Sequence, residues 1–314
     1  MRVLKPEFEA DLAVYGPGSR PDITLADARL YTRSLAGSHY ENFPVATRVL
    51  PRPMRQPIAD VYAFSRWADD LGDEVEPAAD SLRLLDWWQG ELDRCFAGEA
   101  AHPVFVALRQ TVADFRLPQA PLDDLIDAFR QDQTVTRYET AAEVADYCRR
   151  SANPVGRLVL HLAGQATEAN LADSDAICTG LQLANFCQDI ARDAAIGRCY
   201  LPLDQLDRYG LTPNDLVASR SSAKVQAMVA AEVTRAEDHL NLGAALPGRL
   251  PLRVGLTVDL FRRGGLAICR RIRQAEHRVL ERRPKVTKLD AARELAVAVG
   301  QRINRATVRQ SPHR

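Results

Sequence analysis

The stretch LQLANFCQDIARDAAIGRCYLP, residues 181–202, constrains the fold of this 314-residue chain more than any other. Asn185, Asp189 and Asp193 recur at every fourth residue, so an α-helix would place them along one face. Apolar residues fill the positions between them, as in a helix packed inside a bundle. Burying two carboxylates and an amide among apolar neighbours is costly unless a partner compensates them. The pattern therefore predicts either a solvated polar stripe or a binding site for cations.

A second copy of the pattern favours the cation site. AFSRWADDLGDE, residues 63–74, places Asp69 and Asp73 four residues apart, and Asp70 and Glu74 form another such pair. Mg²⁺ takes oxygen ligands and is usually held by a few carboxylates together with substrate phosphates. Four carboxylates around one apolar cavity would repel each other and a bound diphosphate, and divalent cations between them remove that conflict. The two patterns predict facing helices that hold Mg²⁺ through Asp69, Asp73, Asp189 and Asp193.

Composition excludes several other kinds of protein. Lys and Arg total 41, as do Asp and Glu, so bulk charge does not favour a nucleic-acid partner. The six cysteines show no CxxC or metal-type spacing, which is typical of reduced thiols in a cytoplasmic protein. No uncharged run approaches the roughly 20 residues that span a bilayer, and no signal peptide opens the chain. We expect a cytoplasmic protein whose only membrane contact is peripheral, at the inner membrane surface.

The apolar spacing predicts an all-α, single-domain fold with helices around a central cavity. This domain is expected to span residues 23–308, after an irregular segment over 1–22 and before a basic tail over 309–314. No GxGxxG after a strand, GxxxxGK[ST], HExxH or GxSxG motif supports another chemistry. The expected helices are 25–35, 54–76, 81–96, 104–115, 122–134, 141–152, 155–166, 174–194, 223–245, 252–281 and 289–308.

The two carboxylate segments resemble the aspartate-rich motifs of the squalene/phytoene synthase family, the head-to-head isoprenoid synthases. Further similarity runs from about Ser38 to Lys288. Within this family, HYENFPV (39–45) and SANPVGRLVLHLAG (151–164) most resemble the bacterial hydroxysqualene synthases of hopanoid biosynthesis. The resemblance implies the isoprenoid synthase fold, with two facing aspartate-rich helices.

The resemblance also implies a reaction. We expect Mg²⁺-assisted ionisation of presqualene diphosphate and capture of the carbocation by water, giving hydroxysqualene and diphosphate. A presqualene diphosphate synthase is then the expected partner that supplies the substrate. One alternative is a condensing squalene, dehydrosqualene or phytoene synthase that joins two prenyl diphosphates. A second alternative is a non-catalytic assembly factor of the same fold, which ranks last because all four aspartates are present.

Several residues are candidates for substrate binding. His39 and Asn42 align with family positions that touch diphosphate, although the family often has lysine where this chain has Glu41. Arg66, and Arg282 near the end of the expected helix 252–281, are candidate phosphate clamps. Either arginine could instead form a salt bridge on a helix surface.

Other residues are candidates for the chemical step. Gln182 and Asn185 are expected to orient water or a phosphate oxygen. Tyr62 and Phe186 are candidate walls for the carbocation, although either could be a plain core residue. Arg149 is a further candidate.

Two departures from the family pattern point toward water capture. Arg149 stands where the family carries a tyrosine implicated in the first half-reaction, and Gly265 stands where it carries an aromatic residue. An arginine stays protonated, so it cannot act as a base, and its charge opposes a nearby carbocation. We expect it to hold a phosphate oxygen instead. Both changes predict a more polar and roomier pocket.

Overall fold

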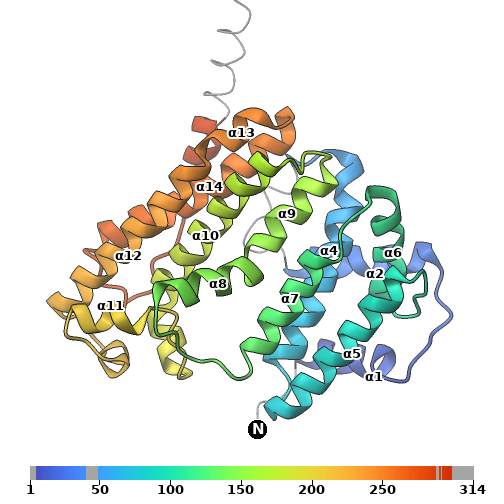
Figure 1. Cartoon of the computed structure of the whole chain (residues 1–314), viewed down its shortest axis with the longest axis horizontal. Coiled ribbons are helices and arrows are strands. Elements are labelled where there is room, and N and C mark those ends of the chain that lie inside the picture. The colour runs from blue at the N-terminus through green and yellow to red at the C-terminus, as the bar shows by residue number, and fades with distance from the viewer. Residues whose placement is uncertain (1–4, 40–48, 288–289, 291, 299–314) are drawn as a thin grey trace, which may run out of the picture. The chain divides into compact units, whose positions relative to one another are not determined.

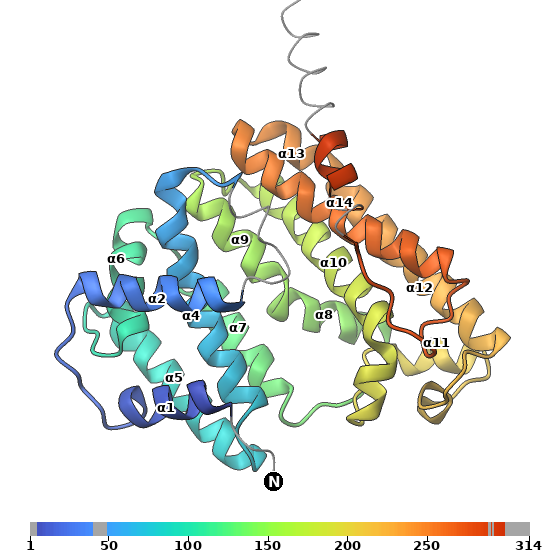
Figure 2. The ribbon, with the colours of Figure 1, turned by 180° about the vertical axis from the view of Figure 1, so that it is seen from behind.

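The computed structural model describes residues 5–39, 49–287, 290 and 292–298 (Figures 1 and 2). Within these ranges the regular structure is helical, and the β-type pairing is one isolated bridge between Arg137 and Cys199. The predicted all-α fold is confirmed. The chain divides into two compact units, described separately here: unit 1 holds residues 1–44, 51–136 and 149–171, and unit 2 holds 45–50, 137–148 and 172–314. The predicted single domain stays a prediction.

Unit 1 is built around the first aspartate helix, which packs against five of its neighbours, α2, α5, α6, α7 and α9. Its apolar residues recur every three or four positions, so they form one buried stripe that includes Val61, Phe64, Ala68 and Leu71. The helices of this unit are α1 (Pro6–Tyr15), α2 (Leu25–His39), α4 (Arg52–Asp73), α5 (Ala78–Phe96), α6 (Pro103–Phe115), α7 (Ala120–Gln131) and α9 (Asn153–Leu162).

A cluster of aromatic rings forms the core of unit 1 around His102. Trp67 stacks on Trp88 with ring centroids 5.3 Å apart, and the His102 ring stands edge-on to Trp67 at 4.5 Å. The backbone N–H of Val104 donates to Nδ1 of His102 at 3.2 Å, so the imidazole also caps the start of α6. His102 is only 2% exposed, and burial lowers its pKa to about 3.

We expect His102 to make the protein less stable in mild acid. The unfolded chain takes up a proton at this residue near pH 6.5, whereas the folded protein does so only near pH 3. Protonation therefore favours unfolding as the pH falls from 6.5 toward 3, and the loss reaches about 3 kcal/mol at pH 4.5. Urea unfolding of wild type and His102→Asn at pH 7 and 4.5 measures it, since asparagine keeps the helix cap without the titration. An equal loss in both proteins would contradict this assignment.

Unit 2 is built on three long helices, α10, α12 and α14, which run side by side in both views (Figures 1 and 2). α8 and α10 each have one end in unit 1. The elements are α8 (Ala141–Ser151), α10 (Glu168–Ala195), α11 (Leu203–Arg208), η1 (Pro213–Leu216), α12 (Ala223–Leu242), η2 (Gly243–Ala245), α13 (Leu246–Arg249) and α14 (Leu252–Gln274).

Two glycines let these three helices approach closely. A Cβ atom on Gly180 of α10 would lie 2.8 Å from the backbone nitrogen of Leu240 and 2.9 Å from the carbonyl oxygen of Ala236, both on α12. On α14, a Cβ atom on Gly265 would lie 2.9 Å from the Leu181 side chain. The prediction that Gly265 makes the pocket roomier is therefore wrong, because leucine side chains already fill the space beside it.

Adding a methyl group at Gly180 should destabilise the protein. Gly180→Ala pushes on backbone atoms that cannot turn aside, and overpacking of this kind costs about 1–3 kcal/mol. Gly264→Ala is the matched control, because nothing lies within 4 Å of a Cβ there and removing a helical glycine gains about 0.5–1 kcal/mol. Chemical unfolding of both variants tests the difference. Equal stabilities would contradict the close approach of α10 and α12.

The structure differs from the sequence prediction mainly in where helices begin and end. Residues 6–15, expected to be irregular, form α1, because Pro6 suits a first turn and Phe8 packs edge-on against Trp67 at 5.4 Å. α2 continues past Leu35 to His39. The predicted helix 252–281 ends at Gln274, where Glu276 and His277 adopt positive φ angles of 51° and 60°. The helix α11 was not predicted.

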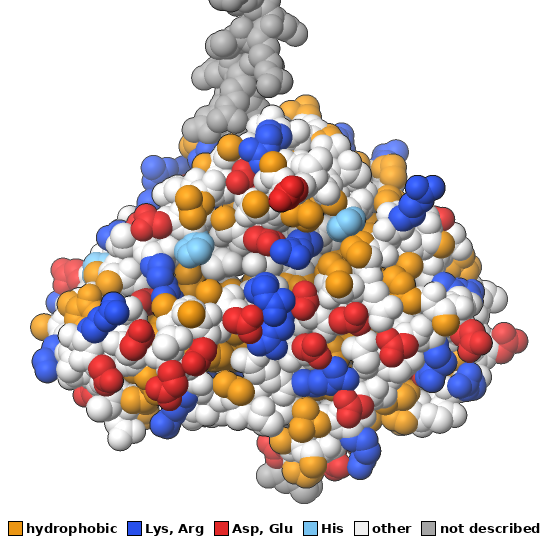
Figure 3. Space-filling view, viewed as in Figure 1, with side chains coloured by type: hydrophobic (Ala, Val, Ile, Leu, Met, Phe, Trp, Pro, Cys, Tyr) orange, Lys and Arg blue, Asp and Glu red, His pale blue; other side chains and the backbone are white. Residues whose placement is uncertain are grey.

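The tail 309–314 and most of the expected helix 289–308 lie outside the described residues. On the face drawn in Figure 3, acidic and basic side chains are interspersed, with apolar side chains between them. Among the described residues, no helix is both long and apolar enough to cross a membrane.

Candidate active site

The α4 helix carries two carboxylate pairs with different surroundings. Asp70 and Glu74 are buried, and Nζ of Lys5 lies 2.7 Å from Glu74 and 3.3 Å from Asp70, which also pairs with Arg66. Asp73 is exposed, and the Asp69 side chain is 40% exposed. The inner pair is thus committed to internal ion pairs, so the predicted pair Asp69 and Asp73 is the one that an incoming cation can reach.

Arg66 lies one turn before these carboxylates and joins both pairs. It grips both oxygens of Asp70, with Nε 2.8 Å from Oδ2, and its Nη1 lies 3.1 Å from Oδ2 of Asp69. Tyr62, a further turn upstream, is half-buried, and burial raises the pKa of its hydroxyl. The predicted residues Tyr62, Arg66, Asp69 and Asp73 therefore lie on one stretch of α4.

The outer carboxylates of α4 repel each other. Burial by the surrounding chain and the negative charge of Asp73 raise the pKa of Asp69 to about 7, against the attraction of Arg66. Water screens a side chain that is 40% exposed, so part of this repulsion is relieved by solvent. A divalent cation would relieve it more fully.

On α10, the predicted polar residues line up as the four-residue spacing requires. Asn185 is exposed and Gln182 is half-buried. The Asp189 side chain is only 11% exposed, and Asp193 is half-buried at the last turn. Burial and the charge of Asp189 raise the pKa of Asp193 to about 7, against attraction from Arg198 and Arg192. Each aspartate helix thus carries one carboxyl whose charge is poorly neutralised.

Asp189 has an arginine partner, but it is Arg283 and not its neighbour Arg282. Nε of Arg283 lies 2.5 Å from Oδ1 of Asp189, and Nη2 lies 3.0 Å from Oδ2. Because α14 ends at Gln274, the predicted position of Arg282 near the end of a long helix is wrong; its side chain is exposed. Arg282 and Arg283 are adjacent in the sequence, but continuing the helix 252–281 could not show which of them reaches Asp189. The role of Arg282 as a phosphate clamp stays a prediction.

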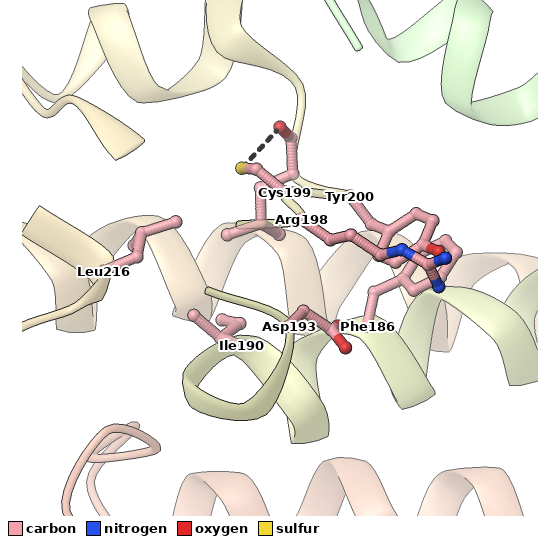
Figure 4. A pocket seen from close by; sticks show the side chains of 8 residues that line it. Phe186, Ile190, Asp193, Arg198, Cys199, Tyr200 and Leu216 are labelled. Atoms are coloured by element: carbon pink, nitrogen blue, oxygen red, sulfur yellow. Dashed lines mark hydrogen bonds between the residues drawn. The ribbon is translucent and has the colours of Figure 1, made fainter. Parts of the chain in front are cut away.

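The turn after α10 brings further residues to Asp193 (Figure 4). Gly197 adopts a positive φ of 78°, which lets the chain reverse, and the backbone N–H of Arg198 then donates to the carbonyl of Asp193 at 2.8 Å. Arg198, Cys199 and Tyr200 line a small pocket together with Phe186 and Asp193. The sequence reading missed Arg198 and Tyr200, although GRCYLP follows the motif directly.

Aromatic rings lie next to this pocket. Phe186 and Tyr200 stack face to face, with centroids 4.3 Å apart and planes 2° from parallel. Tyr147 lies 5.5 Å from Tyr200, and Tyr138 lies 5.5 Å from Tyr147. The predicted wall residue Phe186 thus belongs to a four-ring cluster in unit 2. Such faces can stabilise a cation by about 0.5–2 kcal/mol per well-placed ring.

The described geometry does not test the roles of three predicted site residues, Arg149, His39 and Asn42. Arg149 is exposed in the last turn of α8, and its Nη1 lies 3.4 Å from Oδ1 of Asp124 on α7. His39 ends α2, and its side chain lies outside the description, as does all of Asn42. The roles proposed for these residues stay predictions.

The donor chemistry suits a hard divalent cation. Asp69 and Asp73 on α4 and Asp189 and Asp193 on α10 offer carboxylate oxygens, the ligands that Mg²⁺ prefers. One carboxyl of each motif has a pKa raised to about 7. In the described part of the chain, no three His, Cys, Asp or Glu side chains form a ready cluster for a metal ion. Substrate phosphate and water oxygens usually complete such a site.

Known proteins resemble this chain closely. A hydroxysqualene synthase from Rhodopseudomonas palustris is 38% identical over 224 residues, which cover 70% of this chain and 75% of that protein. A phytoene synthase from Arthrospira platensis is 31% identical over 240 residues, covering 72% and 77% of the two chains. The crystal structure of squalene synthase HpnC from Alicyclobacillus acidocaldarius superposes with a TM-score of 0.77 at 43% identity, covering 81% of this chain and 95% of that one.

The sequence profile of the squalene/phytoene synthase family matches residues 36–290, most of the chain and both aspartate motifs. Members of this family are isoprenoid synthases that process prenyl diphosphates and generally depend on divalent metals. The predicted resemblance and the predicted enzyme class are confirmed. This chain belongs to the squalene/phytoene synthase family and is an isoprenoid synthase.

Proposed function

We propose that this enzyme is a hydroxysqualene synthase, which ionises presqualene diphosphate and adds water to the carbocation. The observation that carries this choice is the identity of 38% with a hydroxysqualene synthase, against 31% with a phytoene synthase, over similar shares of the chain. Hydroxysqualene and diphosphate are the products, within hopanoid biosynthesis. A presqualene diphosphate synthase would supply the substrate.

Asp69 and Asp73 on α4, and Asp189 and Asp193 on α10, would hold Mg²⁺, as the DxxxD spacing of each motif predicts. Bound Mg²⁺ supplies Lewis-acid neutralisation of the diphosphate as the C–O bond breaks. Arg66 already lies on α4 beside Asp69, so it could add a guanidinium contact to a phosphate oxygen. His39, Asn42 and Arg282 are proposed as further diphosphate contacts, on the sequence pattern alone.

The cation that remains must meet one water and no other nucleophile. Apolar and aromatic side chains exclude bulk water and favour a positive charge over their faces. Tyr62 on α4 and Phe186 in the four-ring cluster are the proposed wall residues. Gln182 and the exposed Asn185 carry the amide groups that we propose orient the attacking water on α10.

The condensing alternative keeps support from the 31% identity with a phytoene synthase. The two proposals differ in the substrate consumed, so product analysis separates them. Purified protein is incubated with Mg²⁺ and either presqualene diphosphate or farnesyl diphosphate, with and without NADPH. Hydroxysqualene from presqualene diphosphate without NADPH supports our proposal. A C–C condensation product from farnesyl diphosphate would replace it with the alternative.

We also propose peripheral contact with a membrane, because substrate and product are both strongly apolar. Leu242 at the end of α12 and Leu252 at the start of α14 are each 67% exposed, and Arg253, next to Leu252 in the chain, is also exposed, a combination suited to an anionic lipid surface. The protein should float with anionic liposomes, and Leu242→Asp with Leu252→Asp should weaken this binding. Val14→Asp, at another exposed apolar residue, is the control. Absence of flotation at every lipid composition would argue against membrane contact.

A further inference from the structure

Arg283 occupies the side of Asp189 that a cation would need. Its guanidinium contacts both carboxylate oxygens, at 2.5 Å to Oδ1 and 3.0 Å to Oδ2, which is the bidentate geometry of a strong arginine–carboxylate pair. Nη1 of a second arginine, Arg192, lies 3.6 Å from Oδ1 of Asp189. Because the Asp189 side chain is 11% exposed, little of it is left for another ligand. A metal ion can therefore bind Asp189 only in competition with Arg283.

Arg283 is held in this place by the segment 275–287, which we call the strap. The strap leaves α14 through the left-handed residues Glu276 and His277. The carboxylate of Glu281 accepts hydrogen bonds from the backbone N–H and hydroxyl of Ser221, at 3.0 and 2.8 Å. Beyond Arg283, the side chain of Gln188 donates to the carbonyl of Pro284 at 2.5 Å. The strap is thus fixed on both sides of the arginine.

Gln188 makes the contact two-sided. Its side-chain nitrogen binds the strap backbone, while its side-chain oxygen accepts from Nη2 of Arg283 at 3.2 Å. Gln188 and Asp189 are neighbours on α10, and Gln188 is buried. The strap can therefore keep its Gln188–Pro284 contact while the guanidinium turns away from Asp189.

We propose that Arg283 holds Asp189 when no metal is bound, and exchanges it for the diphosphate when cation and diphosphate bind together. This inference rests on the proposed function, because it needs a diphosphate as the second acceptor. A diphosphate offers the guanidinium another bidentate anionic partner, so releasing Asp189 then costs little. A cation that binds without diphosphate must break the Arg283–Asp189 pair, and the guanidinium then has no new anionic partner. Arg283 is thus a positioning residue that makes metal binding depend on substrate.

Calorimetric titration of the full-length protein tests this coupling without any turnover. Mg²⁺ is titrated alone and with inorganic diphosphate, allowing for the complex that the two form in solution. Inorganic diphosphate should tighten Mg²⁺ binding to the wild type by about tenfold more than to Arg283→Gln, a typical coupling between two sites. Mg²⁺ alone should bind Arg283→Gln more tightly than wild type, and Arg283→Lys should lie between them.

Two further variants separate the guanidinium from the strap. Arg278→Gln removes a strap arginine that pairs with Glu276, and it should couple as the wild type does. Ser221→Ala removes the hydroxyl contact to Glu281 but keeps the Ser221 backbone N–H and Gln188–Pro284 contacts, so Arg283 should stay on Asp189. Hydrogen exchange over 275–287 should then rise while the coupling stays. Coupling lost in Ser221→Ala, or unchanged in Arg283→Gln, would overturn the inference. A wild type that binds no Mg²⁺ under either condition would instead remove the proposed function.

Discussion

Replacing Asp69 or Asp189 with asparagine should lower kcat for presqualene diphosphate by roughly 10³-fold, because metal neutralisation of a leaving group contributes several kcal/mol. Asparagine keeps the shape of each side chain but removes the charge that we propose holds a divalent cation. In the proposed mechanism both residues act on the same departing diphosphate, so the double variant should lose far less than the product of the two single losses. EDTA should abolish turnover, and added Mg²⁺ should restore it.

The matched control is Asp238→Asn, which removes an exposed carboxylate from α12 and should leave kcat unchanged. Asp189→Asn also removes the partner of Arg283, so thermal unfolding of each variant separates a lost metal ligand from a damaged fold. Full turnover in EDTA, or in the double variant, would mean that the carboxylates are not the metal site.

The sequence predicted those features that depend on local spacing. The helices α4 and α10 follow from apolar residues every three or four positions, and the carboxylates at i and i+4 follow from the same geometry. Spacing along α4 does not show which of its two carboxylate pairs is exposed to solvent. Arg66, one turn earlier, pairs with Asp70, but the partner of the buried Glu74 is Lys5, more than sixty residues earlier in the chain.

The errors come from contacts that spacing does not encode. α1 depends on packing between Phe8 and Trp67, so its sequence alone gave a weak helix pattern. α14 ends at Gln274, and the positive φ angles that follow are at Glu276 and His277, so no glycine or proline marks the end in the sequence. That early end changes the path of the chain and brings Arg283 to Asp189.

We expect a large difference in turnover between farnesyl diphosphate and presqualene diphosphate. With farnesyl diphosphate alone the protein should be nearly inert. This prediction rests on the family resemblance, in which Arg149 stands at the position where condensing members carry a tyrosine. An arginine stays protonated and cannot take up a proton in the first half-reaction. The exposed Arg149, paired with Asp124, also presents no hydroxyl to an intermediate. Rapid formation of presqualene diphosphate from farnesyl diphosphate would contradict this prediction.

With presqualene diphosphate, the protein should release diphosphate and an alcohol without NADPH. Water capture predicts that the alcohol oxygen comes from solvent, so turnover in ¹⁸O-labelled water should add two mass units to nearly every product molecule. Attack of water at phosphorus would break the P–O bond and leave the alcohol unlabelled, because the original C–O bond would remain. Proton loss from the cation would give a hydrocarbon with no oxygen at all. Only the labelled alcohol has its new C–O bond to an oxygen from water, as the proposed capture of the carbocation requires.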